Sequence, residues 1–524
     1  MQIPSLPFKI LALGPFRPLE ERVWNQDPLS VDQTNIDAVF QSLNPSLEIP
    51  LSLERGRSLD LTLPFKQLKD FHPDRILENT PYLKSLWDAK KSVKEGKDKG
   101  LAEEEIFQRL LTWPDFPREI LVKPQKSSPS PSRAVENILD MVSLPQGTSR
   151  SSSEPHSALE AIDIFLQGTL KSILADENFR NLESIWQGLK ILLRPESSKG
   201  CLSVQIVPAS LETLVKTLSN LMGRLIQDLP SLLLVDFPFD PSPRNLEWIE
   251  KISGIAETLL VPIILPITPR FFYLNTWADL PKIPFLPHHL QEPAFTQWRH
   301  FRKTPSSRWV ALTCNRFLAR YPYGPNNETR LLRLEETDRL WVSPVWAMGS
   351  LIGQSFLKTG WPTRFTDWHS IQLEDLPLHP AEGARLLCTE TAFSEDRISQ
   401  FIRIGITPLV SSPNQDFAFI PAEASVSGGS LSYQLFLSRI LNFLFWCKDH
   451  FPPDLEASEI QKSLQETFPL FWEKTGHPSP LNLHISATRT QMDKPPIVRI
   501  SFQPPREVLP SGDPVELDFQ WHSG

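Results

Sequence analysis

The chain has 524 residues, of which 40% are hydrophobic and 22% are charged. This length favours two to four packing units, and this composition is that of a globular protein rather than a largely disordered one. The formal net charge is -8, with a sequence pI of 5.8. An electrostatic field of that sign repels phosphate backbones, so we expect no nucleic acid partner.

The sequence shows no targeting or anchoring segment. Met1 to Pro4 lack the basic start and apolar core of a secretion signal, and no apolar run reaches bilayer-spanning length. We therefore expect a cytoplasmic protein with no direct membrane insertion. The four cysteines form no Cys-x-x-Cys pair, which argues against a zinc knuckle or a disulfide framework. They are Cys201, Cys314, Cys388 and Cys447.

The N-terminal region begins with a predicted strand and a predicted hairpin. The apolar run 8–13 ends at Gly14, as a strand closed by a turn does. Apolar residues then alternate with polar or turn residues in two runs, 47–53 and 59–65, which is the signature of a β-hairpin. A cap and a first-turn proline at 79–81 start a helix after the hairpin.

Serine and proline dominate residues 123–157. Such a composition cannot bury enough apolar area to order itself, so we expect a linker between two domains, 1–122 and 158–524. One apolar island in the linker has the spacing of one face of a two-turn helix, and so short a helix needs a partner to bury that face. The island residues are Ile138, Leu139, Met141, Val142 and Leu144.

Strands and helices alternate after the linker. Leu202, Val204 and Ile206 alternate with polar residues, and the run 232–235 is apolar on both faces, as a central parallel strand is. A helical stripe separates these strands, and another apolar run predicts a buried strand at 259–265. A β-α-β-α-β succession packs best as a three-layer sandwich, so we predict an α/β fold that is α+β in parts.

The last third of the chain predicts further helices and two strands. Apolar periodicity indicates helices near 345–357 and 431–447. Two alternating strands follow, at 498–502 and 515–521, and they could form a terminal hairpin or add to the sheet of another subunit. We assign the inter-subunit role to Val498, Ile500, Phe502, Val515, Leu517 and Phe519.

The usual motifs of catalysis and metal binding are missing from the sequence. It contains no Gly-x-Gly-x-x-Gly, no Gly-Lys-Ser/Thr loop and no His-Glu-x-x-His. Asp236 follows a predicted buried strand, where a catalytic acid often lies, but a single carboxylate rarely acts alone. His288 and His289 are adjacent, so they point in different directions, and no nearby cysteine completes a site. We expect no catalytic, cofactor or metal site.

The stretch 298–302, Trp-Arg-His-Phe-Arg, is both aromatic and basic. Such a stretch can bind nucleic acid, but on an acidic protein we interpret it as a packing or interface segment. Arginine and tryptophan are both enriched in protein interfaces, which favours the same interpretation.

Two segments of the N-terminal region carry a family resemblance. Residues 7–16, Pro-Phe-Lys-Ile-Leu-Ala-Leu-Gly-Pro-Phe, look like an opening core strand, and residues 68–74, Leu-Lys-Asp-Phe-His-Pro-Asp, resemble a Leu-Lys-Asp-Phe-x-Pro signature. Both are features of the small, TssB (VipA) type subunit of the contractile sheath of type VI secretion systems. Such subunits usually carry an extra strand before the Pro-Phe-Lys segment, and here Met1 to Leu6 precede it.

The second part of the chain resembles the large, TssC (VipB) type sheath subunit. Residues 179–189 read Phe-Arg-Asn-Leu-Glu-Ser-Ile-Trp-Gln-Gly-Leu, similar to the family motif Phe-Gln-x-Leu-Glu-x-x-Trp-Arg-Gly-Leu. Within the most recognisable block, Asn315 and Tyr321 replace a common proline and leucine. The further similar segments follow in the family order: 298–302, 310–324, 374–377 and 405–409.

The resemblance implies a natural fusion, in which a small-subunit-like β-hairpin/helix unit packs with a large-subunit-like three-layer α/β sheath fold. Proteins of this family are structural protomers that assemble helically around an inner tube and propel it by contraction, without an active site. Strand exchange links the protomers in an open helical array. The implied partners are other copies of the chain, an Hcp-type tube protein and baseplate components.

The linker island also looks similar to the N-terminal helix of large subunits, which a ClpV-type unfoldase grips for recycling. A chance amphipathic segment is the alternative, because short motifs in linkers are weak signals. Two other functions stay open for the whole chain. One is a sheath-like cap or adaptor that binds the end of a tube without polymerising. The other is an α/β enzyme that uses Asp236, since a fold by itself does not determine function.

Overall fold

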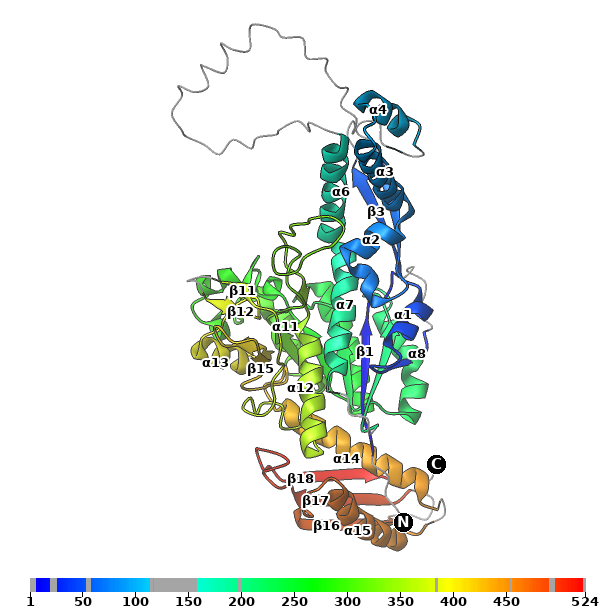
Figure 1. Cartoon of the computed structure of the whole chain (residues 1–524). Coiled ribbons are helices and arrows are strands. Elements are labelled where there is room, and N and C mark those ends of the chain that lie inside the picture. The colour runs from blue at the N-terminus through cyan, green and yellow to red at the C-terminus, as the bar shows by residue number, and fades with distance from the viewer. Residues whose placement is uncertain are drawn as a thin grey trace.

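The molecule is elongated, with an α/β body in the middle (Figure 1). An arm made of helices and a hairpin projects from one end of the body, and a small layer of helices and strands lies at the other end. The fold comes from a computed structural model, which describes residues 6–18, 26–52, 58–113, 116, 158–195, 200–381, 385–452, 455–489 and 495–521.

A seven-stranded sheet forms the centre of the body, in the order β13-β8-β7-β6-β1-β5-β2. Neighbouring strands pair in parallel except β2, which is antiparallel to β5. The mainly parallel sheet confirms the predicted α/β class. The strands are β1 (Phe8–Gly14), β2 (Leu29–Val31), β5 (Leu202–Pro208), β6 (Leu232–Val235), β7 (Ile263–Pro266), β8 (Val310–Cys314) and β13 (Ile406–Pro408).

The first strand of the chain is a central strand of this sheet. Ile10 of β1 pairs with Val204 of β5 on one side and with Leu232 of β6 on the other. Because β1 has a neighbour on both edges, its backbone N–H and C=O groups can be satisfied on both sides. A strand from residues 6–113 therefore completes a sheet whose other strands, apart from β2, come from residues 200–408.

Helices cover both faces of the sheet, which gives the three layers that the sequence predicts. The helices α7 (Glu177–Leu193) and α12 (Pro344–Thr359) lie on one face, and α8 (Leu214–Gln227), α9 (Pro243–Leu259) and α11 (Thr296–Phe301) lie on the other. Alternate side chains of β1 enter the two cores. Ile10 and Ala12 join the core under α7 and α12, and Leu11 and Leu13 join the opposite core.

One predicted boundary is wrong. The apolar run 259–265 predicts a single buried strand, but Leu259 is the last residue of α9 and β7 begins at Ile263. Leu260 ends the helix with a left-handed backbone, φ 56°. Because a buried helix end and a buried strand are both continuously apolar, hydrophobic periodicity cannot separate them.

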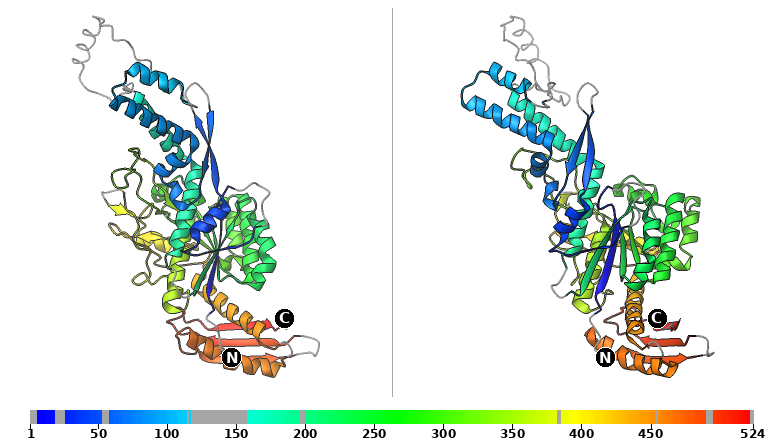
Figure 2. Two further views of the ribbon diagram at one scale, coloured as in Figure 1. Left: turned by 45° about the vertical axis from the view of Figure 1, so that its right-hand side comes forward. Right: turned by 90° about the vertical axis from the view of Figure 1, so that its right-hand side faces the viewer.

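The arm combines elements from before and after the predicted linker (Figure 2). The strands β3 (Ser46–Ser52) and β4 (Ser58–Pro64) pair as the predicted antiparallel hairpin. The helix α6 lies beside α3, and Asp163 of α6 forms an ion pair with Lys90 of α3. The helices are α2 (Pro73–Asn79), α3 (Pro81–Asp98), α4 (Glu103–Leu111) and α6 (Ala158–Ala175).

The C-terminal layer has a hydrophobic core of its own, separate from the two cores of the body. Its three strands form an antiparallel sheet in the order β16-β17-β18, so the predicted terminal hairpin is confirmed and gains a third strand. Leu6, the first described residue, packs against this core. The elements are α14 (Leu431–His450), α15 (Ala457–Lys474), β16 (Leu481–Thr488), β17 (Ile497–Gln503) and β18 (Val515–Gln520).

Shorter elements occupy the connections of the body. Across the described ranges, no helix combines the length and the apolar character needed to cross a membrane. The short helices are α1 (Ile36–Leu43), α10 (Leu286–His289) and α13 (Glu395–Arg403). The two-stranded pairs are β9 (Phe317–Leu318) with β10 (Trp341–Val342), β11 (His379–Pro380) with β12 (Leu386–Leu387), and β14 (Val410–Ser411) with β15 (Ala418–Phe419).

Candidate functional site

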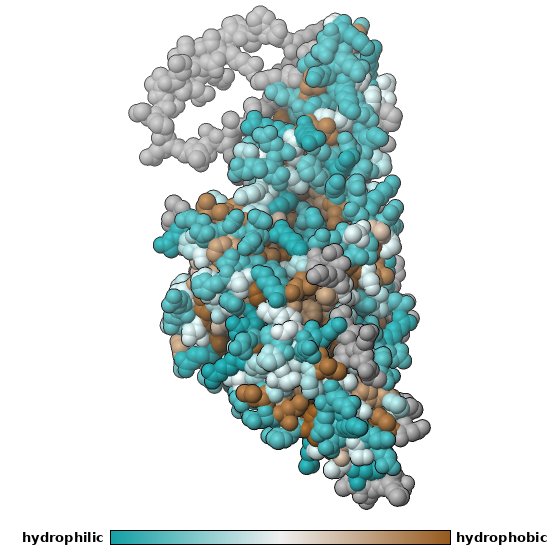
Figure 3. All heavy atoms as spheres, turned by 60° about the horizontal axis from the view of Figure 1, so that its bottom comes forward, coloured by the Kyte–Doolittle hydropathy of each residue, from teal (hydrophilic) through white to brown (hydrophobic). Residues whose placement is uncertain are grey.

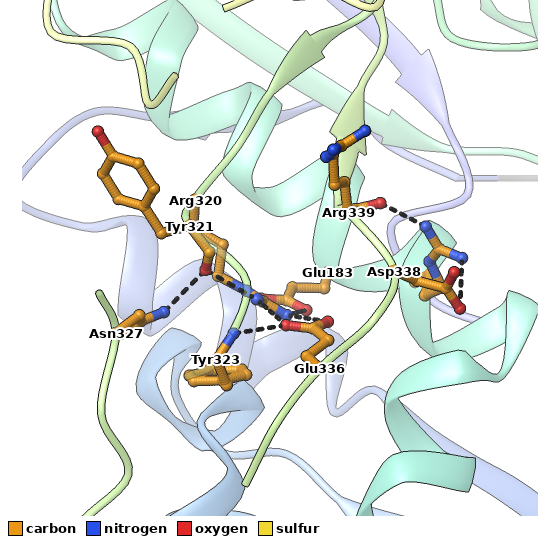
Figure 4. A network of polar contacts seen from close by, with 9 residues as sticks. Glu183, Arg320, Tyr321, Tyr323, Asn327, Glu336, Asp338 and Arg339 are labelled. Atoms are coloured by element: carbon orange, nitrogen blue, oxygen red, sulfur yellow. Dashed lines mark hydrogen bonds and ion pairs between the residues drawn. The ribbon is translucent and has the colours of Figure 1, made fainter. Parts of the chain in front are cut away.

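We call the contact between residues 6–113 and residues 158–521 the seam. A cluster of charged side chains lies beside it. Arg320 is at its centre, between two carboxylates (Figure 4). The Nε of Arg320 donates to Glu183 Oε1 at 2.8 Å, and its Nη1 donates to Glu336 Oε2 at 2.6 Å. The guanidinium also stacks on Tyr323, 4.2 Å from the ring centre. Arg320 therefore joins three segments of the chain.

The cluster is almost closed to solvent. Glu183 comes from α7, Arg320 follows β9, and Glu336 precedes β10; their side chains are 2%, 14% and 6% exposed. Burial alone would lower the pKa of Arg320, but the charge of Glu183 and the hydrogen bonds to Glu183 and Glu336 raise it above its usual range. Burial raises the pKa of Glu183, and the charge of Arg320 opposes that shift. Arg320 thus stays charged and engages both carboxylates.

Asp74 ties the N-terminal region to the loop that carries Arg320. Its carboxylate accepts hydrogen bonds from the backbone N–H groups of Arg330 at 2.9 Å and Leu331 at 3.1 Å. His72 caps the start of α2, because its Nδ1 accepts a hydrogen bond from the Asp74 N–H, and its ring lies edge-on to Tyr323, 5.3 Å between ring centres. The His-Pro-Asp part of the sequence signature therefore contacts the second part of the chain.

A pocket of about 620 Å³ opens at the seam and is lined from both sides of it. Each carboxylate in its wall has a partner. Asp74 accepts the two backbone bonds, Glu183 is held by Arg320, and Glu78 pairs with Arg75 at 3.0 Å. A general base needs an uncommitted lone pair near its substrate, so this arrangement suits a joint between two parts better than proton transfer.

Asp236 lies directly after β6, where the sequence places it, and is partly buried. Its Oδ2 accepts a hydrogen bond from the indole Nε1–H of Trp346 at 2.8 Å. Burial raises the pKa of Asp236, and the nearby Ser343 hydroxyl and the hydrogen bond from Trp346 lower it in part. Neither partner is an acid or a base, so the contacts of Asp236 hold Trp346 of α12 against the end of the sheet.

The two adjacent histidines do not converge. Both are on α10, where His288 is exposed and His289 is partly buried. His289 Nδ1 lies 2.8 Å from Glu292 Oε1, and its ring packs on Phe295 at 5.1 Å. Within the ranges that the structure covers, no group of three or more His, Cys, Asp or Glu side chains could hold a metal ion.

The aromatic and basic stretch of the sequence lies in the C-terminal part of α11, with Arg302 as the residue that caps the helix, and it packs inside the body. Trp298 and Phe301 are fully buried in the core. Arg302 Nε donates to the carbonyl of Val426 at 2.9 Å, and Arg299 donates to two loop carbonyls at 2.8 and 2.7 Å. These cations organise loops of the same chain, which fits the interpretation as a packing segment.

Asn315 stands where the family motif commonly has proline, and its backbone explains why a different residue is needed here. Its φ is 76°, in the left-handed region that proline cannot reach and that asparagine tolerates. The side chain is buried and donates to the carbonyls of Thr391 and Leu409, both at 2.9 Å. Tyr321, the other departure from the motif, is 39% exposed.

The six residues predicted to link subunits form one hairpin of the C-terminal layer. Each residue from β17 is opposite one from β18: Val498 with Phe519, Ile500 with Leu517, and Phe502 with Val515. Four of them are fully buried in the layer's own core, and Leu517 and Phe519 are partly buried. Among the described residues, β16 and β18 each pair with one strand only, so each has a free backbone edge.

The five residues predicted to bind an unfoldase lie outside the described residues, so their assignment stays a prediction. They are Ile138, Leu139, Met141, Val142 and Leu144.

Comparison with known proteins assigns the chain to a family. Residues 156–224 and 230–427 match the family described as "EvpB/VC_A0108, tail sheath N-terminal domain". Residues 2–112 match the family described as "Type VI secretion system, VipA, VC_A0107 or Hcp2". The chain belongs to the type VI secretion sheath family. Both sheath families occur in this one polypeptide, so the resemblance to a fusion of the small and large subunits is confirmed.

A curated relative of this sheath-family chain is the Type VI secretion system sheath protein TssC1 of Pseudomonas aeruginosa, 29% identical over 322 residues. The match covers 55% of this chain and 64% of the relative, so the chain spans less than two thirds of that protein. Two solved assemblies of the anti-feeding prophage, its baseplate and its helical sheath in the contracted state, also match, each at a TM-score of 0.32 and 10% identity. These matches cover 64% of this chain and 76% and 78% of theirs.

Proposed function

We propose that this chain is the structural protomer of a contractile type VI secretion sheath, which assembles helically around an inner tube and propels it by contraction. The presence of both sheath families in one chain carries the proposal. The position of β1 between β5 and β6 supports it, because a sheet that needs both parts keeps the two subunits together in each copy. Tethering also fixes their stoichiometry at one to one.

Copies would associate through the C-terminal layer. A free strand edge can accept a strand from a neighbour by main-chain hydrogen bonds, while side-chain pockets hold the register. β16 and β18 offer such edges, whereas the side chains of β17 that face inward are used by the layer's own core. We therefore assign the inter-subunit contact to these two edges, with Leu517 and Phe519 beside the added strand.

Exposed apolar side chains on the same layer support this assignment. Phe445 on α14, Leu470 on α15 and Leu481 on β16 are 42%, 43% and 69% exposed. Seen from the end that carries the layer, hydrophobic residues form small patches between hydrophilic ones (Figure 3). Small separate patches add contact area to a backbone-mediated interface without being a large apolar surface by themselves.

The proposed partners follow from the sheath role. They are other copies of the chain, an Hcp-type inner tube protein, baseplate components and a ClpV-type unfoldase. We propose that the protein works in the cytoplasm, without nucleic acid, membrane insertion or a catalytic step. The full engagement of the carboxylates in the seam pocket supports the last point.

Electron microscopy of the purified chain, alone and with its tube protein, tests the sheath role. We expect helical tubes or curved arcs. Strictly monomeric particles under both conditions would rule the role out, and finite rings or complexes of a few copies would favour the cap or adaptor instead.

The unfoldase assignment has its own test. Replacing Ile138 and Leu139 with aspartate removes the apolar face of the predicted linker helix, so we expect loss of binding to a ClpV-type unfoldase in a pull-down. Tubes should form as before, because the two residues lie outside the predicted domains. Unchanged binding of the double variant would reject the assignment.

A further inference from the structure

Arg439 of α14 is a buried cation, and across the described ranges no Asp or Glu side chain forms an ion pair with it. Its side chain is in the interior, and the residue is 6% exposed. The guanidinium carbon lies 4.5 Å from the ring centre of Phe356, 5.4 Å from that of Trp361 and 5.7 Å from that of Phe471. Its Nη1 donates a long hydrogen bond, 3.4 Å, to the carbonyl of Leu6. Arg439 is thus held by three aromatic rings and one backbone oxygen.

These contacts do not make Arg439 a favourable residue for stability. Within the described ranges its Nε has no acceptor. Burial lowers its pKa to about 9, and the interaction with the Cys201 thiol opposes that shift only in part. Removing a guanidinium from water is costly unless a partner compensates for it, and cation–π contacts compensate only in part. Apolar residues of similar volume often replace buried charges without loss of stability. The presence of arginine here therefore requires another explanation.

Three parts of the molecule meet at this guanidinium. Leu6 belongs to the segment that leads into β1. Phe356 belongs to α12 of the body and stacks on Phe8 of β1, 5.3 Å between ring centres. Trp361 and Phe471 belong to the core of the C-terminal layer. Arg439 is therefore placed where the N-terminal segment, the central sheet and the C-terminal layer come together.

We propose that Arg439 is a positioning residue that fixes the orientation of the C-terminal layer, and of the segment before β1, relative to the central sheet. The proposal rests on the proposed sheath function. Apolar packing is non-directional, whereas a planar guanidinium limits the angles at which its rings and acceptor can lie. In an open helical array the same contact repeats at every copy, so the angle between body and layer must be the same each time.

Two substitutions of Arg439 and one control test this proposal. Arg439→Met keeps much of the length and packing but removes the charge and its donors, whereas Arg439→Lys keeps a cation. The control is Arg244→Met, because Arg244 is 73% exposed and pairs with Glu212 on the surface. We expect Arg439→Met to have an unchanged or higher melting temperature and yet to lose regular tubes in electron micrographs. Arg439→Lys should recover tubes at least in part, and Arg244→Met should form them normally.

Each other outcome has a meaning. Regular tubes from Arg439→Met would overturn the proposal. Loss of folding in both Arg439 variants would also overturn it, because the arginine would then be needed for stability rather than for orientation.

A second measurement separates this proposal from the sheath function. If the native chain forms no tubes, the sheath function fails, and Arg439 is judged by amide hydrogen exchange of the soluble chain. Faster exchange in peptides covering 6–14 and 431–450 of Arg439→Met, with the other strands of the body unchanged, would support the positioning role. Identical exchange in those peptides would reject it.

Discussion

Ile10 of β1 is the register partner of Val204 of β5, although the whole predicted linker separates them in sequence. The same strand pairs with β6 on its other edge. Two strands from the second part of the chain, β5 and β6, are therefore separated in the central sheet by β1, which comes from the first part. A strand with two neighbours is harder to remove than an edge strand, because both rows of hydrogen bonds must break.

The first prediction concerns a chain cut within the predicted linker. A protease site inserted between residues 126 and 134 should allow complete cleavage, and the two fragments should still elute together in size-exclusion chromatography. Hydrogen bonds on both edges of β1 and the buried side chains of Ile10 and Leu11 hold them together.

The matched control for this cut is Ala12→Asp. Ala12 is fully buried in β1, and an unpaired carboxylate there costs several kcal/mol, so the cleaved variant should separate or aggregate. Separation of the cleaved native fragments in mild buffer would contradict the importance of the shared sheet.

The second prediction concerns the charge cluster at the seam. Arg320→Met removes the cation that pairs with the buried Glu183 and Glu336, so it should destabilise the fold by about 3–5 kcal/mol in denaturant unfolding. Adding Glu183→Gln and Glu336→Gln to the same chain should restore most of the loss, because neutral amides need no cation.

The control for the cluster is the exposed pair of Arg499 and Asp518, which are 70% and 57% exposed. Arg499→Met should change stability by no more than about 0.5 kcal/mol, because solvent screens the pair. Equal effects of Arg320→Met and Arg499→Met would show that the buried cluster is not structural.

The third prediction concerns Asp236 and pH. The folded state raises the pKa of Asp236 above its ordinary value, so the folded state holds the proton more tightly than the unfolded chain. The stability from this group is therefore present at pH values below the unfolded pKa, about 3.9, and is lost as pH rises through the folded pKa. The side chain in Asp236→Asn does not ionise, so this variant should not lose stability in this way as pH rises. Its amide oxygen can still accept the hydrogen bond from the indole N–H of Trp346.

Thermal unfolding at pH 4 and pH 8 measures this effect. The melting temperature of Asp236→Asn relative to the native chain should be higher at pH 8 than at pH 4. Asp236→Ala should be destabilised by about 1–3 kcal/mol at pH 4, because the indole N–H of Trp346 loses its acceptor, and by less at pH 8, because it also lacks the titrating carboxyl. A difference between Asp236→Asn and the native chain that does not change with pH would contradict the prediction.

The fourth prediction compares two helical glycines. A Cβ atom at Gly188 of α7 would overlap the indole of Trp346 on α12, so Gly188→Ala should destabilise the fold by about 1–3 kcal/mol. Apart from the backbone of its own helix, no described atom lies within 4 Å of a Cβ at Gly168 of α6, so Gly168→Ala should stabilise by up to about 1 kcal/mol through helix propensity. Thermal denaturation of both variants checks the opposite signs, and a loss in both would refute the close packing of α7 on α12 as the cause.

Much of the secondary structure could be predicted from the sequence. The runs 8–13 and 232–235 are strands, 47–53 and 59–65 form a hairpin, and 498–502 pairs with the last strand. These elements follow from the alternation and clustering of apolar residues, which is a local property of the chain. The order of the sheath-like segments and the lack of common catalytic motifs are also visible in the sequence.

The cluster at the seam was missed, although one signal for it is present. Glu183 is a single carboxylate on the apolar face of α7, between Leu182 and Ile185, which are both buried. A charge in such a position requires a buried partner. The sequence could not name Arg320 as that partner, because many arginines lie at similar distances along the chain.

The sequence by itself determined most of the segments that become strands and helices, and through its motifs the family of the chain, because periodicity and motifs are patterns of residues close together in the polypeptide. Only the tertiary structure decided that β1 inserts between β5 and β6, that Glu183 meets Arg320, and that Arg439 meets Leu6. Strand order and charge pairing depend on which distant residues the packing brings within hydrogen-bond reach. The local pattern of apolar and polar residues does not show which distant residues will be in contact.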